Sequence, residues 1–233
     1  MYYLIADLTV QMNPQHQPLK DQCLPYKINE LPLLVDCVIP QGAKTIAAYQ
    51  RKKPHLSVGE AEYLLYGAYF YDTLLRHEGI MLHASCVVYR NYAYLFSANS
   101  GVGKSTHTQI WCKVFKEAFI LNDDKPALKF NGNTLFAYGT PFSGKTNQNI
   151  NAKYPVAGIA FLQQNPINEI KRISSKEAII NFINQTLKPH DEERYDLMAT
   201  TLDRILELIP FYTFNVNRDD EAAILAYQTM RID

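Results

Sequence analysis

The pattern of apolar and polar positions divides the chain into a β-rich beginning and a longer region in which strands and helices alternate. In residues 1–56, short apolar runs between proline and polar breaks predict strands at 1–10, 31–35, 38–40 and 45–49. A helix is predicted from Ser57 to His77, because Ser57 and Glu60 match a capping box and Gly79 follows the last turn.

The pattern after this helix predicts a mixed sheet. We predict strands over residues 80–89, 92–96, 118–121, 127–130, 134–138, 156–162, 169–173 and 211–216. Further helices are predicted over residues 104–116, 175–187, 192–209 and 219–230. The predicted fold class is therefore α/β, with a small β-rich part over 1–56 and a main domain over 57–233. The two parts could equally form one continuous domain.

Composition and charge narrow the class of protein. The 233 residues are 47% hydrophobic, and 23 basic residues balance 23 acidic ones, so neither nucleic acid nor an anionic membrane is an expected partner. The apolar stretch at 63–75 is too short to span a bilayer, and the N-terminus does not resemble a signal peptide. Four cysteines without metal-ligand spacing predict buried free thiols, and we predict a cytoplasmic location. The oligomeric state stays open.

A glycine-rich segment between a predicted strand and a predicted helix is the strongest chemical signal. Gly101 and Gly103 let the backbone aim several N–H groups at one phosphate, and Lys104 and the Ser105 hydroxyl can then reach the phosphates and a Mg²⁺ ion. Ala98 stands where such loops usually carry their first glycine. The predicted nucleotide-binding residues are Ser100, Gly101, Val102, Gly103, Lys104, Ser105 and Thr106.

Two adjacent carboxylates follow this loop closely. Asp123 and Asp124 lie 18 and 19 residues after Ser105, which is enough for one helix and one returning strand. We therefore expect the pair at an exposed strand end beside the loop, where one carboxylate can hold the metal and the other can accept a hydroxyl proton. The alternative is a turn with two solvated aspartates. His83, on the strand before the loop, is a third candidate, although a lone histidine on a strand is often structural.

These three segments occur in an order that resembles HPr kinase and phosphoenolpyruvate carboxykinase. The segments that carry the resemblance are Met81-Leu82-His83-Ala84-Ser85, Ser100-Gly101-Val102-Gly103-Lys104-Ser105-Thr106 and Asn122-Asp123-Asp124, within about residues 80–140. The resemblance implies that Lys104 and Ser105 bind the nucleotide phosphates and the metal. Asp123 and Asp124 would share the metal and general-base roles, in either assignment, and His83 would lie near the metal or the transferred phosphate.

The chain departs from the pattern of each of these families. HPr kinases usually carry Glu directly after the loop serine, where this chain has Thr106, as the carboxykinases do. The chain is too short for a carboxykinase, and the strand before His83 carries no lysine to serve as the extra metal ligand. The resemblance is therefore to an HPr-kinase-like protein of unassigned acceptor.

A long polar loop over residues 139–151 has glycines for hinging and several polar side chains. Ser143, Lys145 and Asn149 are its candidate substrate contacts, and the loop is either a lid or a surface connection. On the helix after the phosphate loop, His107 and Lys113 are expected to face solvent. The tyrosines at 63, 66, 69 and 71 are interpreted as core or interface residues.

The leading hypothesis is an ATP- and Mg²⁺-dependent kinase that phosphorylates a hydroxyl group. The acceptor would be a serine of a protein or peptide, or a small-molecule alcohol, and the choice of ATP over GTP stays open. The alternatives are a nucleotide-binding regulatory module without transfer, and a simple NTPase. Pure binding needs no general base, which favours the kinase, and no residue stands out to orient water for an NTPase.

Overall fold

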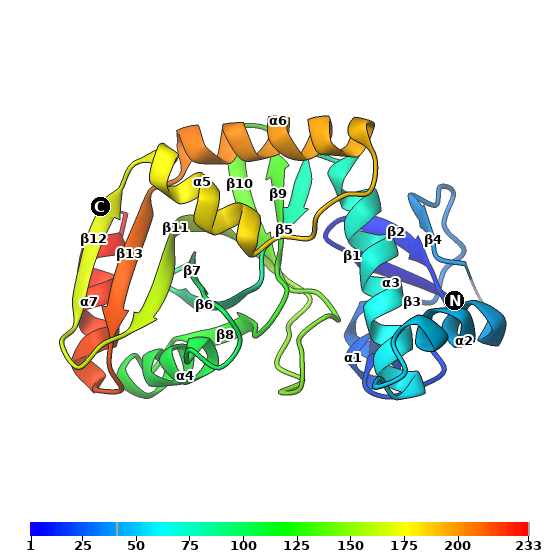
Figure 1. The fold of residues 1–233 in the computed structure, drawn as a ribbon, viewed down its shortest axis with the longest axis horizontal. Helices are drawn as coiled ribbons and strands as arrows, with labels where there is room; N and C mark the ends of the chain where they lie inside the picture. The colour runs from blue at the N-terminus through cyan, green and yellow to red at the C-terminus, as the bar shows by residue number, and fades with distance from the viewer. Residues whose placement is uncertain (41, 233) are drawn as a thin grey trace.

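The computed structural model describes residues 1–40 and 42–232, which form two β-sheets (Figure 1). The smaller sheet lies near the N-terminus and has the order β3-β1-β2-β4. Its strands are β1 (Tyr2–Ile5), β2 (Leu8–Gln11), β3 (Lys27–Ile28) and β4 (Cys37–Val38).

The larger sheet has nine strands and carries the rest of the fold. Its strands are β5 (Gly79–Met81), β6 (Ala84–Tyr89), β7 (Tyr92–Ser97), β8 (Phe119–Asn122), β9 (Ala127–Asn131), β10 (Thr134–Tyr138), β11 (Lys153–Gln164), β12 (Glu169–Ile173) and β13 (Phe211–Val216). Strands β7, β11 and β13 are parallel, whereas β6 is antiparallel to both β7 and β8. Strands β7 and β8 therefore end at the same edge, and the mixed α/β architecture predicted from the sequence is confirmed.

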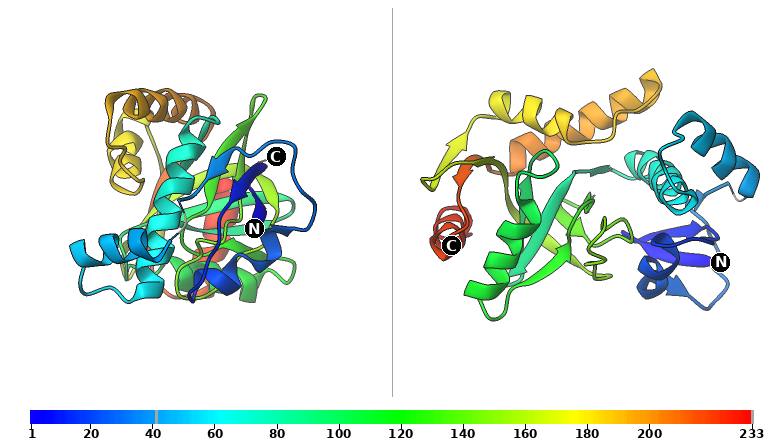
Figure 2. Two further views of the ribbon diagram at one scale, coloured as in Figure 1. Left: turned by 90° about the vertical axis from the view of Figure 1, so that its right-hand side faces the viewer. Right: turned by 60° about the horizontal axis from the view of Figure 1, so that its bottom comes forward.

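Helices cover both faces of the larger sheet (Figures 1 and 2). The helices of the chain are α1 (Leu19–Gln22), α2 (Ala43–Lys52), α3 (Val58–Leu75), α4 (Lys104–Val114), α5 (Ser175–Asn184), α6 (Glu192–Leu208) and α7 (Asp220–Met230), with a 3₁₀ turn at Leu24–Tyr26. Phe182 of α5 and Ile205 of α6 are fully buried on one face, and Trp111 of α4 and Ala226 of α7 are fully buried on the other. The large sheet is thus the middle of three layers.

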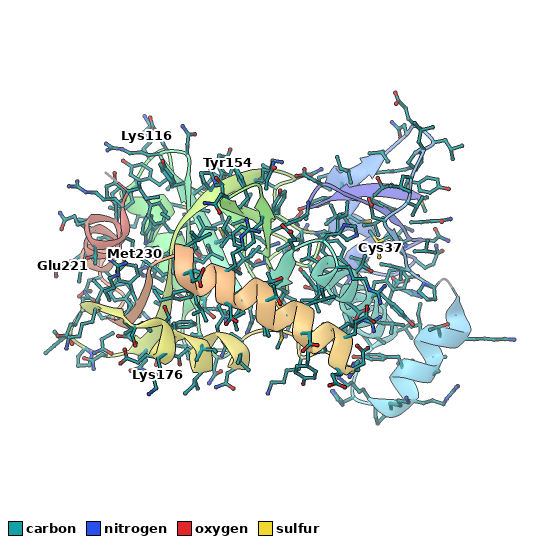
Figure 3. The ribbon with its side chains drawn as sticks, turned by 90° about the horizontal axis from the view of Figure 1, so that it is seen from above. Cys37, Lys116, Tyr154, Lys176, Glu221 and Met230 are labelled. Carbon is teal, nitrogen blue, oxygen red and sulfur yellow. The ribbon has the colours of Figure 1, made fainter. Side chains whose placement is uncertain are left out.

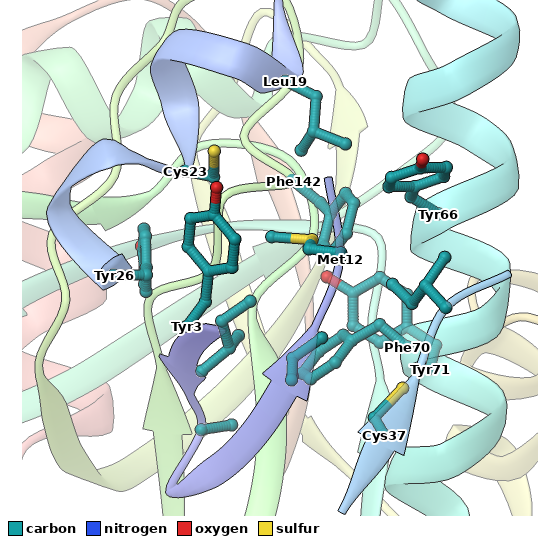
Figure 4. Close-up of a cluster of buried hydrophobic side chains, with 14 of the residues drawn as sticks. Tyr3, Met12, Leu19, Cys23, Tyr26, Cys37, Tyr66, Phe70, Tyr71 and Phe142 are labelled. Carbon is teal, nitrogen blue, oxygen red and sulfur yellow. The ribbon is translucent and has the colours of Figure 1, made fainter. Parts of the chain in front are cut away.

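Helix α3 joins the two sheets. The predicted capping box is present, since Ser57 accepts a hydrogen bond from the Glu60 amide and the Glu60 side chain accepts one from Ser57 N. Tyr66 and Phe70 of α3 pack with side chains of the small sheet and with Phe142, which comes from the 139–151 loop (Figure 4). Both sheets share this hydrophobic cluster, and the domain boundary placed near residue 56 stays a prediction.

Charged side chains lie on the outer surface of the protein. Seen from above, α6 lies across the sheet, and the exposed side chains of Lys116, Lys176 and Glu221 point outward (Figure 3). The four cysteines are free thiols, as predicted, of which Cys112 alone is half-exposed. Within residues 1–40 and 42–232, no helix has the length and apolarity to cross a membrane.

Two strand predictions in the first part are wrong. Residues 45–49 lie inside helix α2, in which Ile46 is buried. A short apolar run is compatible with a helix and with a strand, so the pattern did not distinguish them. Residues 31–35 form no strand: Leu31, Leu33 and Leu34 are exposed, and Pro32 has no N–H for a ladder.

Two other predicted strands are interrupted. Residues 1–10 form a hairpin, in which Ala6 and Asp7 turn the chain at φ values of 53° and 60° without a glycine to mark the turn. The strand predicted at 80–89 is two strands. Strand β5 pairs with β9, whereas β6 pairs with β7 and β8, so the chain changes partners at Leu82–His83. No proline or glycine at this point marks the change of partner in the sequence.

Candidate active site

The glycine-rich segment turns sharply between β7 and α4. Gly101 and Gly103 have φ values of 85° and 112°, a region that other residues rarely adopt, and Gly103 directly precedes the helix. The first N–H groups of α4 therefore face the loop, together with the positive end of an 11-residue helix. This arrangement is suited to holding a phosphate.

Lys104 is held beneath this loop. Its side chain is buried, and its Nζ donates a 2.9 Å hydrogen bond to the carbonyl of Ala98, the residue at the position of the missing first glycine. Burial lowers the pKa of Lys104, and the nearby carboxylates of Asp124 and Asp123 partly oppose this effect. An ammonium group paired only with a carbonyl is under-compensated, so an anion in the pocket would stabilise it.

Asp123 is tied to the helix side of the site. Its Oδ1 accepts a 2.6 Å hydrogen bond from Ser85 Oγ, and Ser85 in turn lies 2.7 Å from the Thr108 hydroxyl of α4. The Asp123 amide donates to the carbonyl of Gln148. Asp123 is only 4% exposed, so the expectation of an exposed strand end is wrong for this residue. A chain of hydroxyl groups instead fixes the carboxylate against the first turns of α4.

Asp124 is tied to the opposite side. Its Oδ1 lies 3.1 Å from His83 Nε2, and its Oδ2 pairs with Lys125 Nζ and accepts a 3.4 Å hydrogen bond from the Tyr63 hydroxyl. Burial acts to raise the pKa of Asp124, but the hydrogen bond from His83 and the charge of Lys125 outweigh it and lower the pKa to about 2. Asp124 is therefore an ionised, oriented carboxylate at neutral pH.

Asn122 shapes the corner that separates the two carboxylates. Its Oδ1 accepts hydrogen bonds from the amides of Asp124 and Lys125, at 3.0 and 2.8 Å. Its Nδ2 donates to the carbonyl of Thr140, at 2.9 Å. The side chain thus closes a tight turn after β8, and this turn directs Asp123 and Asp124 to different neighbours.

The 139–151 loop is anchored over much of its length. The Gly144 amide donates to the Tyr63 hydroxyl at 2.9 Å, and its carbonyl accepts a 2.8 Å hydrogen bond from Gln22 Nε2. Gly144 has a φ of 70°, and a Cβ there would meet the Cβ of Asp124 at 3.0 Å. Ser143 is buried and accepts a hydrogen bond from Asn149, whereas residues 145–147 are exposed. Only this tip is free to move without breaking buried contacts.

These segments surround one pocket of about 300 Å³. Its lining residues are His83, Ser100, Gly101, Gly103, Lys104, Ser105, Thr106, Asp123, Asp124, Ser143, Gly144, Lys145 and Thr146. Two predicted site residues lie outside the lining. Val102 packs against the core beneath α4 and α7, and Asn149 reaches the pocket only through its hydrogen bond to Ser143. The structure therefore gathers most of the predicted site residues around one space.

A larger cavity of about 440 Å³ lies between α2, α3 and residues 186–191. Its walls are mainly apolar, and among the charged side chains that line it, Arg194 pairs with both Asp72, at 2.6 Å, and Asp191. It contains neither the glycine-rich loop nor the Asp123–Asp124 pair, so we place the candidate chemistry in the smaller pocket.

The prediction for His107 is wrong, whereas that for Lys113 is confirmed. His107 is 2% exposed, it accepts a 3.0 Å hydrogen bond from Trp111 Nε1, and burial lowers its pKa to about 3. Lys113 is exposed and pairs with Asp220 on α7. Of the four tyrosines on α3, all but Tyr69 are buried.

Several residues of the site were missed from the sequence. Lys125 directly follows the aspartate pair, and Ser85 lies two residues after His83, so both are close in sequence to predicted site residues. Gln185 contacts His83 from 102 residues away and carried none.

The side chains of the pocket provide few ligands for a metal ion. Among the residues that the structure describes, no group of three or more His, Cys, Asp or Glu side chains gathers as a metal cage. Mg²⁺ at phosphate-binding sites usually needs only one or two protein ligands, and phosphate oxygens and waters complete its shell. The Ser105 hydroxyl and the Asp123 carboxylate, both lining the pocket, fit this requirement.

The comparisons with known proteins leave the family open. No family model matches the chain, and no curated protein matches it. Among solved structures, the chain is similar to the HPr(Ser) kinase/phosphatase from Coxiella burnetii, with a TM-score of 0.37 and 12% identity over 64% of this chain and 93% of that chain. A likeness this distant decides nothing about activity.

Proposed function

We propose that this protein is an ATP- and Mg²⁺-dependent kinase that transfers the γ-phosphate to a hydroxyl acceptor. The observation that carries the proposal is the composition of the 300 Å³ pocket: a helix N-terminus with a buried lysine faces two differently held carboxylates across one space. Phosphoryl transfer depends mainly on positioning and charge stabilisation, and such a pocket supplies both.

The nucleotide phosphates would lie on the glycine-rich loop. The N–H groups at the start of α4 donate to phosphate oxygens, Lys104 contributes its charge, and the Ser105 and Thr106 hydroxyls lie at the same end of the helix. Ser105 and Asp123 would hold Mg²⁺, which neutralises charge on the phosphates when bound. We assign Asp123 this role because Ser85 and Thr108 fix it on the α4 side of the pocket.

Asp124 would receive the acceptor. It lies against Gly144 and His83, on the side of the pocket formed by the 139–151 loop, so an incoming hydroxyl can donate to it. A carboxylate with a pKa of about 2 is a weak base, so it orients the hydroxyl and takes its proton only as the bond to phosphorus forms. His83 and Lys125 hold the carboxylate in place during this step.

A second candidate is a nucleotide-binding module that transfers nothing. It is favoured by the pairing of Asp124, because both of its oxygens already have partners in this structure. For the kinase, the acceptor hydroxyl must share one of these oxygens. A carboxylate oxygen can accept two hydrogen bonds, so the pairing leaves room for the acceptor.

Labelled ATP distinguishes the two candidates. The protein would be incubated with γ-labelled ATP, Mg²⁺ and either a protein extract or a small-molecule extract, and the label located after separation. The kinase predicts label on one acceptor class, with none when Asp124→Asn replaces the wild type. Nucleotide binding without any labelled product would favour the module.

The exposed tip of the 139–151 loop predicts one protease-sensitive site. Trypsin should cut after Lys145 in the free protein, because residues 145–147 are exposed, while residues 140–143 are buried and resist opening. ATP with Mg²⁺ should slow this cut, because Lys145 lines the pocket. Cutting at the exposed Arg51–Lys53 segment serves as the internal control and should not change. Mass spectrometry of the fragments reports both cuts. If ATP with Mg²⁺ slows neither of them, the loop is a surface connection.

A further inference from the structure

Gln185 contacts two parts of the site from a distant place in the chain. It follows the last turn of α5, and its side-chain Oε1 lies 3.1 Å from His83 Nδ1. Its Nε2 donates a 2.8 Å hydrogen bond to Oδ1 of Asn99, in the glycine-rich segment. Its carbonyl accepts a 2.7 Å hydrogen bond from the His83 amide. One residue therefore contacts both the histidine of the site and the phosphate loop.

His83 needs such support because of its position. It lies in the break between β5 and β6, where the chain changes sheet partners, so no strand ladder holds its amide. The His83 ring lies between two hydrogen-bond acceptors, Gln185 Oε1 at Nδ1 and Asp124 Oδ1 at Nε2. The orientation of the ring toward Asp124 therefore depends on the Gln185 side chain.

The Gln185 side chain is itself held at both ends. The next residue, Thr186, donates a 2.6 Å hydrogen bond to the carbonyl of Met81, which fixes the segment against β5. The hydrogen bond to Asn99 orients the amide so that its oxygen faces His83. The result is a continuous path of contacts from the phosphate loop through Asn99, Gln185 and His83 to Asp124.

We propose that Gln185 is a positioning residue that couples the phosphate loop to the His83–Asp124 pair. The proposal rests on the proposed kinase function. Asn99 directly precedes Ser100, which lines the pocket, so a nucleotide that orders the loop would order Asn99 as well. Asn99 would then hold the Gln185 amide, and the amide would hold the His83 ring against Asp124. Gln185 does not line the pocket and touches no reacting group. Its effect is on the geometry of the carboxylate that receives the acceptor.

A purely structural role of Gln185 can be separated from this one. The backbone of Gln185 closes the end of α5 through its amide, which donates to the carbonyl of Phe182, and supports His83 through its carbonyl. Neither contact needs the side chain, so a side-chain replacement leaves both in place. Methionine has a similar length and no hydrogen-bond acceptor strong enough for the His83 ring.

The test compares Gln185→Met with Asn184→Met. Asn184 is the exposed neighbour on the same helix, so Asn184→Met is a matched control. We expect Gln185→Met to lower kcat about 10- to 100-fold, because partners that orient an active-site ligand usually contribute that much. The Kd for ATP and the urea midpoint of unfolding should match those of the control. Gln185→Glu keeps an oxygen facing His83 but loses the amide donor to Asn99, so it should recover only part of the loss in kcat.

A double-variant cycle tests the path itself. In the His83→Ala background, Gln185→Met should have no further effect on kcat, because the ring that it orients is absent. Multiplying effects, or an unchanged kcat in Gln185→Met alone, would overturn the proposal. The proposal would also fail if Gln185→Met lowered the urea midpoint of unfolding together with kcat, because the side chain would then be structural.

Imidazole ¹⁵N NMR provides a readout that does not need activity. The His83 signals, assigned by their absence in His83→Ala, should have the same Nδ1 chemical shift in the wild type and in Asn184→Met, and a different one in Gln185→Met, where the contact with Gln185 Oε1 is lost. If the wild type transfers no phosphate while this NMR signature is present, the kinase function fails and the contact stands. Transfer with no change of the His83 signals in Gln185→Met would instead refute the positioning role.

Discussion

Replacement of Lys104 by alanine is expected to weaken ATP binding by about 30- to 5,000-fold. The loss of one partner of a buried charge pair costs about 2 to 5 kcal/mol, and each 1.4 kcal/mol is a factor of about ten in Kd. Lys104 is buried under the loop and donates only to a neutral carbonyl in this structure, so its charge is available to a phosphate. Calorimetry with ATP and Mg²⁺ measures the change directly.

Lys113→Ala is the matched control for this experiment. Lys113 is a lysine on the same helix, but it is exposed and pairs with Asp220 at the surface, where an ion pair contributes little. It should leave the Kd for ATP unchanged. Equal affinities of wild type, Lys104→Ala and Lys113→Ala would show that no phosphate binds on this loop.

Replacement of Asp123 or Asp124 by asparagine should change different kinetic parameters. Asp124→Asn should lower kcat by about 10²-fold or more at saturating Mg²⁺, because the amide cannot take the acceptor proton. Asp123→Asn should raise the Mg²⁺ concentration needed for half-maximal activity, because a neutral amide is a weaker ligand than a carboxylate. Steady-state kinetics over a series of Mg²⁺ concentrations separates the two effects.

Both aspartates are more buried than the sequence suggested, so folding must be measured with activity. Asp124→Asn leaves His83 and Lys125 without their carboxylate partner, and we expect a loss of about 1 to 3 kcal/mol in the free energy of unfolding. ATP binding should persist, since it depends on Lys104 and the loop amides. Asp203→Asn, at an exposed position on α6, is the control and should change nothing. If kcat is unchanged in both site variants, the pair is only a turn.

The parts of the site that could be predicted from the sequence are those encoded within short segments. The turn at Gly101 and Gly103 and the helix from Lys104 depend on neighbouring residues, so their pattern was visible. Asp123 and Asp124 could be placed near the loop because one helix and one strand return the chain to the same sheet edge. Their roles remain proposals.

The features that were missed depend on tertiary contacts. The change of partners at Leu82–His83 is marked by no proline or glycine, so no turn residue revealed it. Residues 45–49 were predicted as a strand but lie within helix α2, since a short apolar run does not distinguish the two. Gln185 reaches His83 across 102 residues, and the burial of His107 depends on Phe96 and Phe214, which face it from β7 and β13.

ATP consumption by the purified protein, with and without an acceptor-containing fraction, tests the kinase function most directly. A kinase must keep water from the γ-phosphate until the acceptor fills the pocket. We therefore predict that the protein alone hydrolyses ATP far more slowly than the roughly 10 s⁻¹ typical of enzymes. Addition of the acceptor fraction should raise consumption sharply, with one phosphate on the acceptor for each ATP used and no rise in Asp124→Asn. Brisk release of free phosphate by the protein alone, unaffected by any fraction, would contradict the kinase and identify an NTPase.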